Sequence, residues 1–282
     1  MLLFGAIFRC LDPILTIAAM LSYKSPFITP FGKEPEFNAV RKKFENHNSD
    51  LLTMYKAYCE WKSNYGKSSS IMGEFCQKNF LSDQNLRMID DLKKQYLSLL
   101  NESGIKQAKS YNVNSTSTPI INAAIVAGLY PKVIHRDLQM QQFINRDQKT
   151  VYIHPSSVNY PLQNAKKPNK DWFVYNTMIQ TKKLYVRDTS LVEVVDLVLF
   201  GRETEVKHEI KLLTIDKWIK LQCFAKTATL LKYLREQLNK ILKYKIDHPE
   251  AELEQEQKEW LNLILGVIKS CEIDFSPGRV SV

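Results

Sequence analysis

The spacing of the apolar residues changes at Pro131, and this change most restricts how the chain can fold. Before it, apolar side chains recur every three or four residues, as at Leu86, Ile89 and Leu92, which is typical of helices. After it, apolar and polar residues alternate, as in residues 150–154, which is typical of half-buried strands. The sequence therefore predicts a helical region followed by a β region, not strands and helices that alternate along the chain.

The first 104 residues are predicted to be helical. Ser49 and Asp50 precede an apolar pattern that continues to Trp61. Ser82 begins a second, longer pattern, and Gly104 stands just past its end. These stripes are expected to form the core of a helical bundle.

The first 21 residues are apolar enough to suggest a signal peptide or a membrane anchor. Arg9, Asp12 and Pro13 interrupt them well short of the ~20 residues that cross a bilayer, and no basic segment precedes them. We therefore expect two short buried helices with Asp12 as the N-cap of the second, and no membrane span.

The β region is expected to form a small barrel. Residues 106–118, which precede it, are polar and predict a linker or surface excursion. Strands are predicted at residues 132–136, 150–155, 172–187 and 191–201. Strands so close together, without long helices between them, favour a barrel. A further strand is expected at residues 217–223, followed by two helices that Pro249 separates.

The distribution of charge favours an anionic partner. The chain carries a net charge of +9, and between residues 130 and 190 ten lysines and arginines stand against four acidic residues. Most of the excess positive charge therefore lies in the β region, which is the expected footprint of a surface that attracts polyanions.

One strand in this region carries groups suited to nucleic acid. Alternation within residues 175–187 predicts a face with hydroxyl, ammonium, phenol and guanidinium groups, from Thr181, Lys183, Tyr185 and Arg187. Cations neutralise phosphates and aromatic rings stack on unpaired bases, so this face is a candidate site for single-stranded nucleic acid. A solvated edge strand whose charges prevent aggregation explains the same pattern, and spacing alone does not decide between the two.

The sequence indicates no catalytic, cofactor-binding or metal-binding residues. It has no phosphate-binding G-x-x-x-x-G-K-[ST] loop and no dinucleotide-binding fingerprint. The five scattered cysteines lack C-x-x-C spacing and are expected to be reduced thiols in an intracellular protein. His154 precedes Pro155 and two serines without a carboxylate placed by motif, so we expect a hydrogen-bonded turn residue there, not a catalytic base.

Several stretches together resemble the C-terminal region of DEAH/RHA-type RNA helicases. They are GAIFRCLDPILTIAAMLSYKSPF at 5–27, DLLTMYKAYCEW at 50–61, FCQKNFLSDQNLRMIDDLKKQ at 75–95, AAIVAGLYPKV at 123–133, TVYIHPSSVNY at 150–160 and WFVYNTMIQTKKLYVRD at 172–188. The resemblance implies an α+β fold, with an N-terminal ratchet-like helical bundle, a small antiparallel oligonucleotide-binding (OB) barrel and C-terminal helices. With the patterns above, it predicts domains at residues 1–118, 119–205 and 206–282.

The same resemblance implies a role in RNA binding. In that family the barrel touches single-stranded RNA, and the T-x-K-x-Y-x-R pattern carries this contact to Lys183 and Arg187, and to Thr181. Tyr185 is expected either to contact RNA or to pack. Relatives often have Thr where Lys182 stands, so no role carries over to it, nor to residues 106–118 and 166–170.

The motor domains of the family have no counterpart in this sequence. ATP and Mg²⁺ are therefore expected to bind those absent domains, and the chain by itself is not expected to hydrolyse ATP. We expect a piece of a larger helicase in the cytoplasm, with the nucleus as the alternative, whose partners are single-stranded RNA and its own motor domains. A second hypothesis is a protein-interaction scaffold that docks a regulatory protein or a ribosome surface through its C-terminal helices.

Overall fold

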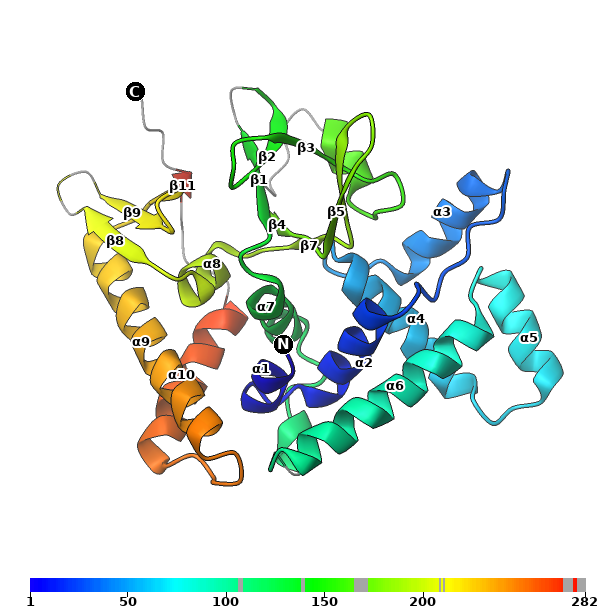
Figure 1. The fold of residues 1–282 in the computed structure, drawn as a ribbon, viewed down its shortest axis with the longest axis horizontal. Coiled ribbons are helices and arrows are strands. Elements are labelled where there is room, and N and C mark those ends of the chain that lie inside the picture. The colour runs from blue at the N-terminus through cyan, green and yellow to red at the C-terminus, as the bar shows by residue number, and fades with distance from the viewer. Residues whose placement is uncertain are drawn as a thin grey trace.

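The computed structural model describes residues 1–105, 109–137, 140–164, 172–207, 209, 211–270 and 276–277. The chain has the predicted α+β fold, with helices first, strands next and two long helices near the end (Figure 1). The helices that precede the first strand are α1 Leu2–Ile7, α2 Leu11–Ser22, α3 Glu34–Phe44, α4 Asp50–Asn64, α5 Ser69–Lys78, α6 Asp83–Glu102, the 3₁₀ helix η1 Lys109–Asn112 and α7 Thr118–Leu129.

The predicted serine caps begin two of these helices. The Ser49 hydroxyl accepts a hydrogen bond from the Leu52 backbone N–H at 3.2 Å and begins α4. Ser82 does the same for Asn85 at 3.2 Å and begins α6. Gly104 follows α6 with φ +91°, a left-handed conformation that glycine adopts without strain. Each cap satisfies a backbone donor that the first turn of a helix leaves unpaired.

Asp12 is not the N-cap of α2, contrary to expectation. The helix begins at Leu11 after Cys10, and the backbone N–H of Asp12 donates to Oδ1 of Asn112 at 2.8 Å. Asn112 belongs to residues 106–118, predicted as a linker, of which 106–108 lie outside the described residues. From 109 onward this segment packs on the helices, and Asn114 is 9% exposed. Its polar side chains form hydrogen bonds with backbone groups at the ends of α1 and α2, about 100 residues away in the sequence. A local pattern does not reveal such contacts.

The β region forms a seven-stranded sheet above α7 (Figure 1). Its strands are β1 Val133–Asp137, β2 Gln142–Asn145, β3 Thr150–Ile153, β4 Trp172–Val174, β5 Thr177–Gln180, β6 Leu184–Arg187 and β7 Ser190–Leu191. The order is β5-β6-β3-β2-β1-β4-β7, and the pairs are antiparallel except β3 with β6, which is parallel. Inward side chains such as Phe143, Val151 and Val186 form a small core of their own.

Two of the predicted strands are wrong in extent. Residues 172–187 form β4, β5 and β6 with turns between them, not one long strand. Residues 191–201 are strand only at Leu191, and then form helix α8, Val194–Phe200. This helix contacts α7 and α9 and is buried on most sides. A short helix that is apolar except for one residue shows no clear helical period, so it could not be told from a buried strand.

Asp196 is a buried carboxyl group in α8, 2% exposed, and its Oδ1 has no hydrogen-bond partner among the described residues. Burial, and next the nearby Glu193, raise the pKa of Asp196 well above its ordinary value. The folded chain therefore holds this proton more tightly than the unfolded chain does. Its contribution to stability is greatest below the ordinary pKa of about 4, and decreases as the pH rises toward the folded pKa.

The isosteric substitution Asp196→Asn should therefore stabilise the chain at neutral pH. We expect the free energy of unfolding at pH 7.5 to rise by about 1–3 kcal/mol, because the amide does not titrate and so loses no stability as the pH rises above the ordinary carboxyl pKa. The gain should shrink at pH 5, where the pH is closer to that ordinary pKa. Urea unfolding at the two pH values measures this. Asp247→Asn, which changes an exposed carboxylate of α9, is the control and should leave both values unchanged within ~0.5 kcal/mol. An equal gain at both pH values would contradict the assigned cause.

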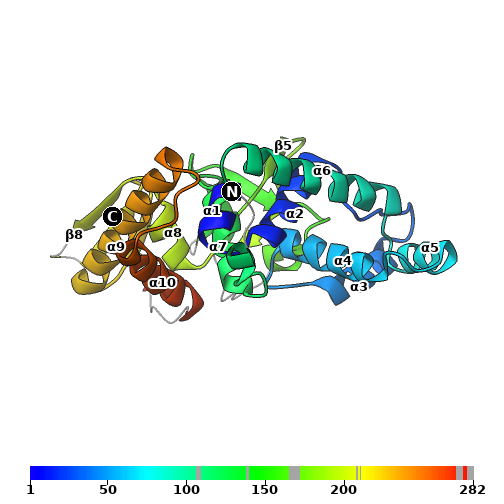
Figure 2. The same ribbon diagram turned by 90° about the horizontal axis from the view of Figure 1, so that it is seen from below.

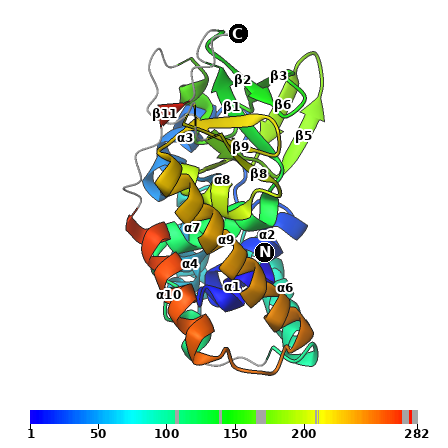
Figure 3. The same ribbon diagram turned by 90° about the vertical axis from the view of Figure 1, so that its left-hand side faces the viewer.

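A second sheet and two long helices complete the chain. The strands are β8 Thr204–Lys207, β9 Leu212–Ile215, β10 Ile219–Gln222 and β11 Ser276–Pro277, and the helices are α9 Ala225–Asp247 and α10 Gln255–Ser270. β10 confirms the strand predicted at 217–223, whereas β8 and β9 were not predicted. α9 and α10 pack side by side below this sheet (Figure 3). α5 lies at the opposite end of the molecule (Figure 2).

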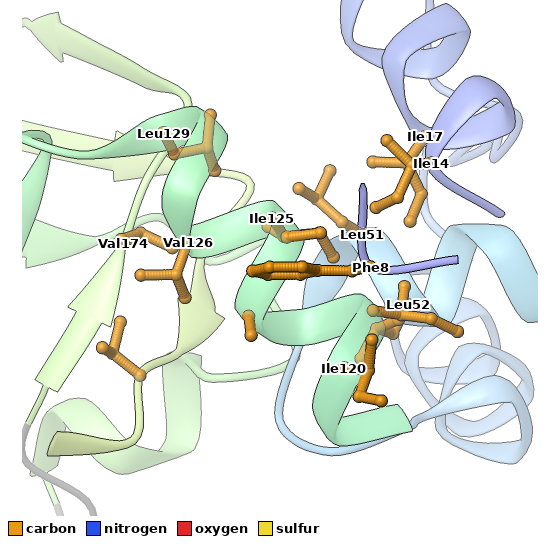
Figure 4. Packing of buried hydrophobic residues seen from close by; sticks show 14 of the residues in the cluster. Phe8, Ile14, Ile17, Leu51, Leu52, Ile120, Ile125, Val126, Leu129 and Val174 are labelled. Atoms are coloured by element: carbon orange, nitrogen blue, oxygen red, sulfur yellow. The ribbon is translucent and has the colours of Figure 1, made fainter. Parts of the chain in front are cut away.

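The largest hydrophobic core includes buried residues of α1, α2, α4 and α7, and a few from the barrel, whose other inward side chains form the separate core described above. Figure 4 shows Phe8, which follows α1, among Leu51 of α4, Ile14 of α2 and Ile125 of α7, and each of these side chains is fully buried. The same core includes residues of α8, α9 and α10. The helical region, the barrel and the C-terminal part are therefore packed together, and their division at residues 119 and 206 remains a prediction.

Candidate nucleic-acid interface

The predicted cation-bearing face lies on a hairpin formed by β5 and β6. Ile179 is opposite Tyr185, and Thr177 is opposite Arg187. Residues directly opposite each other on antiparallel strands point to the same side. Thr177, Ile179, Tyr185 and Arg187 therefore lie on one side of the sheet, as predicted, although they come from two antiparallel strands and not from one.

Thr181 lies in the turn of this hairpin and is exposed. Its backbone N–H donates to the carbonyl oxygen of Lys183 at 2.9 Å, and its hydroxyl donates to the same oxygen at 3.3 Å. The structure thus places Thr181 at the end of the hairpin, where its polar groups close the turn.

Lys183 also lies at the end of the hairpin and extends over the neighbouring strand. Its ammonium nitrogen is 4.2 Å from the centre of the Tyr152 ring on β3. Tyr152 pairs in register with Tyr185 of β6, and the two ring centres are 6.0 Å apart. Lys183 is therefore a cation held beside two half-buried aromatic rings.

Arg187, at the end of β6, is held by a histidine. Its Nη2 donates to Nε2 of His154 at 2.8 Å, and the His154 ring meets Tyr185 edge-on with ring centres 5.8 Å apart. The other ring nitrogen lies 2.7 Å from the Ser156 hydroxyl, which confirms His154 as a hydrogen-bonded turn residue. Burial, and next the Arg187 guanidinium, lower the pKa of His154. A neutral ring at neutral pH leaves Nε2 able to accept from Arg187.

Tyr152, His154, Lys183, Tyr185 and Arg187 together form a continuous surface that we call the ridge. Three of its members were predicted from the sequence, while Tyr152 and His154 were not. The alternation of β3 places Tyr152 on the side opposite the buried Val151 and Ile153, and the half-buried His154 follows the strand directly. This alternation was the available signal. What spacing did not reveal is the parallel pairing of β3 with β6, which lies some thirty residues further along the chain.

A groove of about 860 Å³ separates one edge of the ridge from the helical region. On the barrel side it is lined by His154, Arg187 and residues of β5. On the other side it is lined by residues of α2, α3, α4 and the loop before α3. Lys183 and Tyr185 do not line it. The ridge therefore meets the groove at Arg187 and continues outside it toward Lys183.

Asp50, the first residue of α4, fixes the position of the barrel against the helical region. Its Oδ1 accepts hydrogen bonds from Nη2 of Arg41 at 2.6 Å and from the Val158 N–H at 2.8 Å. Its Oδ2 accepts from the Ser157 hydroxyl at 2.6 Å and from the Thr189 N–H at 2.9 Å. Ser157 lies three residues after His154, and Thr189 lies two residues after Arg187. The Asp50 carboxylate therefore holds in place the two segments that carry the end of the ridge beside the groove.

The described residues contain no group of three or more His, Cys, Asp or Glu side chains arranged to hold a metal ion. In the same ranges, no helix is both long enough and apolar enough to cross a membrane. The ridge and its groove are thus the feature that most suggests a ligand.

Three families match successive parts of the chain. The helicase-associated domain (HA2), described as ratchet-like, matches residues 1–54. The oligonucleotide/oligosaccharide-binding (OB) fold matches residues 121–204, and the C-terminal domain in RNA helicases matches residues 211–270. A ratchet-like domain followed by an OB fold defines the class of helicase-associated regions.

Similar proteins extend over nearly the whole chain. ATP-dependent RNA helicase DHX29 of Homo sapiens is 33% identical over 291 residues, which cover 96% of this chain and 21% of that protein. ATP-dependent DNA/RNA helicase DHX36 of Bos taurus is 34% identical over 263 residues, which cover 88% of this chain and 26% of that protein. DExH-box ATP-dependent RNA helicase DExH1 of Arabidopsis thaliana is 31% identical over 279 residues, covering 96% and 27%. The three family matches and these relatives show that the chain is homologous to DExH-box RNA helicases over most of its length. It spans about a fifth to a quarter of the length of these relatives.

Proposed function

We propose that the chain is the accessory RNA-binding module of an ATP-dependent RNA helicase, and that it grips single-stranded RNA on the ridge. Motor domains outside this sequence would bind ATP and Mg²⁺ and supply the movement. The observation that carries the proposal is the grouping of two exposed cations, Lys183 and Arg187, with the rings of Tyr152 and Tyr185 on one side of the barrel.

The chemistry of the ridge fits an unpaired polynucleotide. Lys183 and Arg187 are exposed at its two ends, so each can meet a phosphate and release the counterions bound there. Tyr152 and Tyr185 are half-buried, which fixes their rings while leaving part of each accessible. A base stacked on such a ring is stabilised by about 1–3 kcal/mol, with little preference for sequence. Weak, sequence-tolerant binding that decreases with salt is the expected behaviour.

The salt dependence of binding tests this proposal. We expect fluorescence anisotropy of labelled oligouridylate to show weak binding that is strongest at low salt. The plot of log affinity against log salt concentration should have a slope near −2 to −3.5, from about three to five phosphate contacts. Lys183→Ala and Arg187→Ala should each make the slope shallower by about 0.7, because each removes one contact with a single strand.

Lys182→Ala is the matched control, since Lys182 is an exposed lysine on the same hairpin but lies outside the ridge. It should change the slope by less than half as much as Lys183→Ala. Equal slopes for all four proteins would show that the ridge cations do not meet phosphate. A chain that fails to bind oligouridylate would instead favour a scaffold that docks a protein.

A further inference from the structure

We propose that a cavity between α1 and the two C-terminal helices binds a small phosphorylated molecule. The cavity has a volume of about 380 Å³, and its lining comes from α1, η1, α9, α10 and the loops after α1 and α9. We call it the Arg9 cavity. The connection between α9 and α10 lies at the opposite end of the molecule from the barrel (Figure 1), so this site is separate from the ridge.

The Arg9 cavity carries more positive than negative charge. Three cationic side chains line it, from Arg9, Lys245 and Lys258, against the single carboxylate of Glu252. Nζ of Lys258 lies 3.0 Å from Oε2 of Glu252. The pKa of Glu252 is lowered first by this hydrogen bond and further by the Lys245 ammonium group. One carboxylate thus serves two ammonium groups, and the lining keeps an excess of two positive charges.

Lys245 is a buried cation on α9. It is 5% exposed, and its ammonium group donates to the carbonyl oxygen of Ala251 at 2.8 Å. Among the described residues, no carboxylate lies close enough to form an ion pair with it. Lysine is rarely buried without a counter-ion, because an uncompensated charge away from water is costly. An anion in the Arg9 cavity would supply the missing negative charge.

Arg9 is fixed through its backbone, while its side chain has no partner. Its carbonyl oxygen accepts from the Asn114 N–H at 2.8 Å, and Nδ2 of Asn114 donates to the carbonyl oxygen of Phe8 at 2.9 Å. The half-buried guanidinium group forms no hydrogen bond or ion pair within the part of the chain that the structure describes. A guanidinium group can donate two parallel hydrogen bonds to phosphate oxygens. Arg9 is therefore placed to bind a phosphate.

The size and the other side chains of the cavity select the class of ligand. Ser110 and Tyr111 of η1 bring hydroxyl groups that can donate to phosphate oxygens. A phosphate group carries close to two negative charges at neutral pH, which match the excess in the lining, whereas a monocarboxylate carries one. The volume lies within the ~300–1,000 Å³ that is usual for small-molecule sites. The apolar part of the wall comes from Ala6, Ile7, Leu253 and Leu261.

Inorganic pyrophosphate is a suitable probe, and Arg9→Gln is the first variant. Isothermal titration calorimetry with the 282-residue chain should show one binding site for pyrophosphate. Arg9→Gln should weaken this binding about ten- to a hundredfold, because it removes hydrogen bonds between charged groups. Lys243→Gln is the matched control, since Lys243 is an exposed lysine of α9 that does not line the cavity. It should change the affinity less than about twofold, because salt screens a distant charge.

Glu252→Gln should have the opposite effect. Glu252 is exposed, so the fold should tolerate the change, which removes the one carboxylate of the lining. We expect pyrophosphate to bind about two- to fivefold more tightly, an effect of the size of an exposed ion pair. A damaged fold cannot produce tighter binding, so this variant keeps the test decisive even if Arg9→Gln lowers the stability of the chain.

Three results would overturn the phosphate site. They are failure to bind pyrophosphate, equal weakening by Arg9→Gln and Lys243→Gln, and binding of acetate as tight as that of pyrophosphate. Competition in a chain that carries both Lys183→Ala and Arg187→Ala identifies the source of the phosphate. Oligouridylate should not displace pyrophosphate from this chain, and displacement would assign the cavity to RNA instead of a small molecule. The RNA grip on the ridge is tested separately by its salt slope, so either proposal can fail alone.

Discussion

Replacement of Asp50 by alanine should lower the free energy of unfolding by about 3–5 kcal/mol, the largest effect that we expect from a single substitution in this chain. Asp50 is 2% exposed and Arg41 is 8% exposed, so the substitution leaves a buried guanidinium without its counter-ion. It also removes the acceptor of Ser157 and of the Thr189 backbone N–H. Urea unfolding of the 282-residue chain measures the loss.

A double-mutant cycle shows how much of this cost comes from the buried guanidinium. Arg41→Ala combined with Asp50→Ala should cost less than the sum of the two single substitutions, because neither charge is then left alone. Asp91→Ala, which breaks an exposed ion pair with Lys94 on α6, is the control and should cost no more than about 1 kcal/mol. A loss below about 1 kcal/mol for Asp50→Ala would show that the barrel is held in place by other contacts.

Acidification from pH 7 to pH 5 should reduce the stability of the chain by about 2 kcal/mol through His135 alone. Burial lowers the pKa of His135 to about 4, against an ordinary value near 6.5. The unfolded chain therefore binds this proton more readily than the folded chain does. The stability contributed by the neutral ring is fully present above pH 6.5 and is lost as the pH falls toward 4.

The surroundings of His135 explain this burial and suggest the variant to use. The ring of His135 on β1 stacks on the ring of Trp172 on β4, with ring centres 4.6 Å apart. The ring centre of Trp218, in the β9–β10 connection, lies 5.7 Å from that of His135. His135→Phe keeps an aromatic ring in this stack and removes the titrating group. Urea unfolding should show that this variant loses about 2 kcal/mol less between pH 7 and pH 5 than the unaltered chain.

His248→Phe is the control for this prediction, since His248 is an exposed histidine at the end of α9. It should change the difference in stability between pH 7 and pH 5 less than His135→Phe does. An acid sensitivity that His135→Phe does not reduce would mean that other groups cause it.

The candidate site could be predicted in part. Alternation correctly places Tyr185 and Arg187 on one face. In the β5–β6 hairpin they lie opposite Ile179 and Thr177, so the residues predicted to share a face still point to the same side. The resemblance to RNA helicases also assigned the fold. The turn at residues 181–183 was missed, since two short strands and one long strand give the same alternation. Tyr152 and His154 were missed as ridge members because they join it through a parallel pair that is distant in sequence.

The sequence by itself determined the order of helical and β regions, the serine caps of α4 and α6, and the outward direction of Arg187 on β6. These features depend on residues within a few positions of one another, and local spacing records which side of an element is buried. Only the tertiary structure decided that Asn112 caps α2, that residues 194–200 form a helix and that Asp50 joins the two walls of the groove. Each of these depends on partners brought together from distant parts of the chain, and such contacts leave no periodic trace in the sequence.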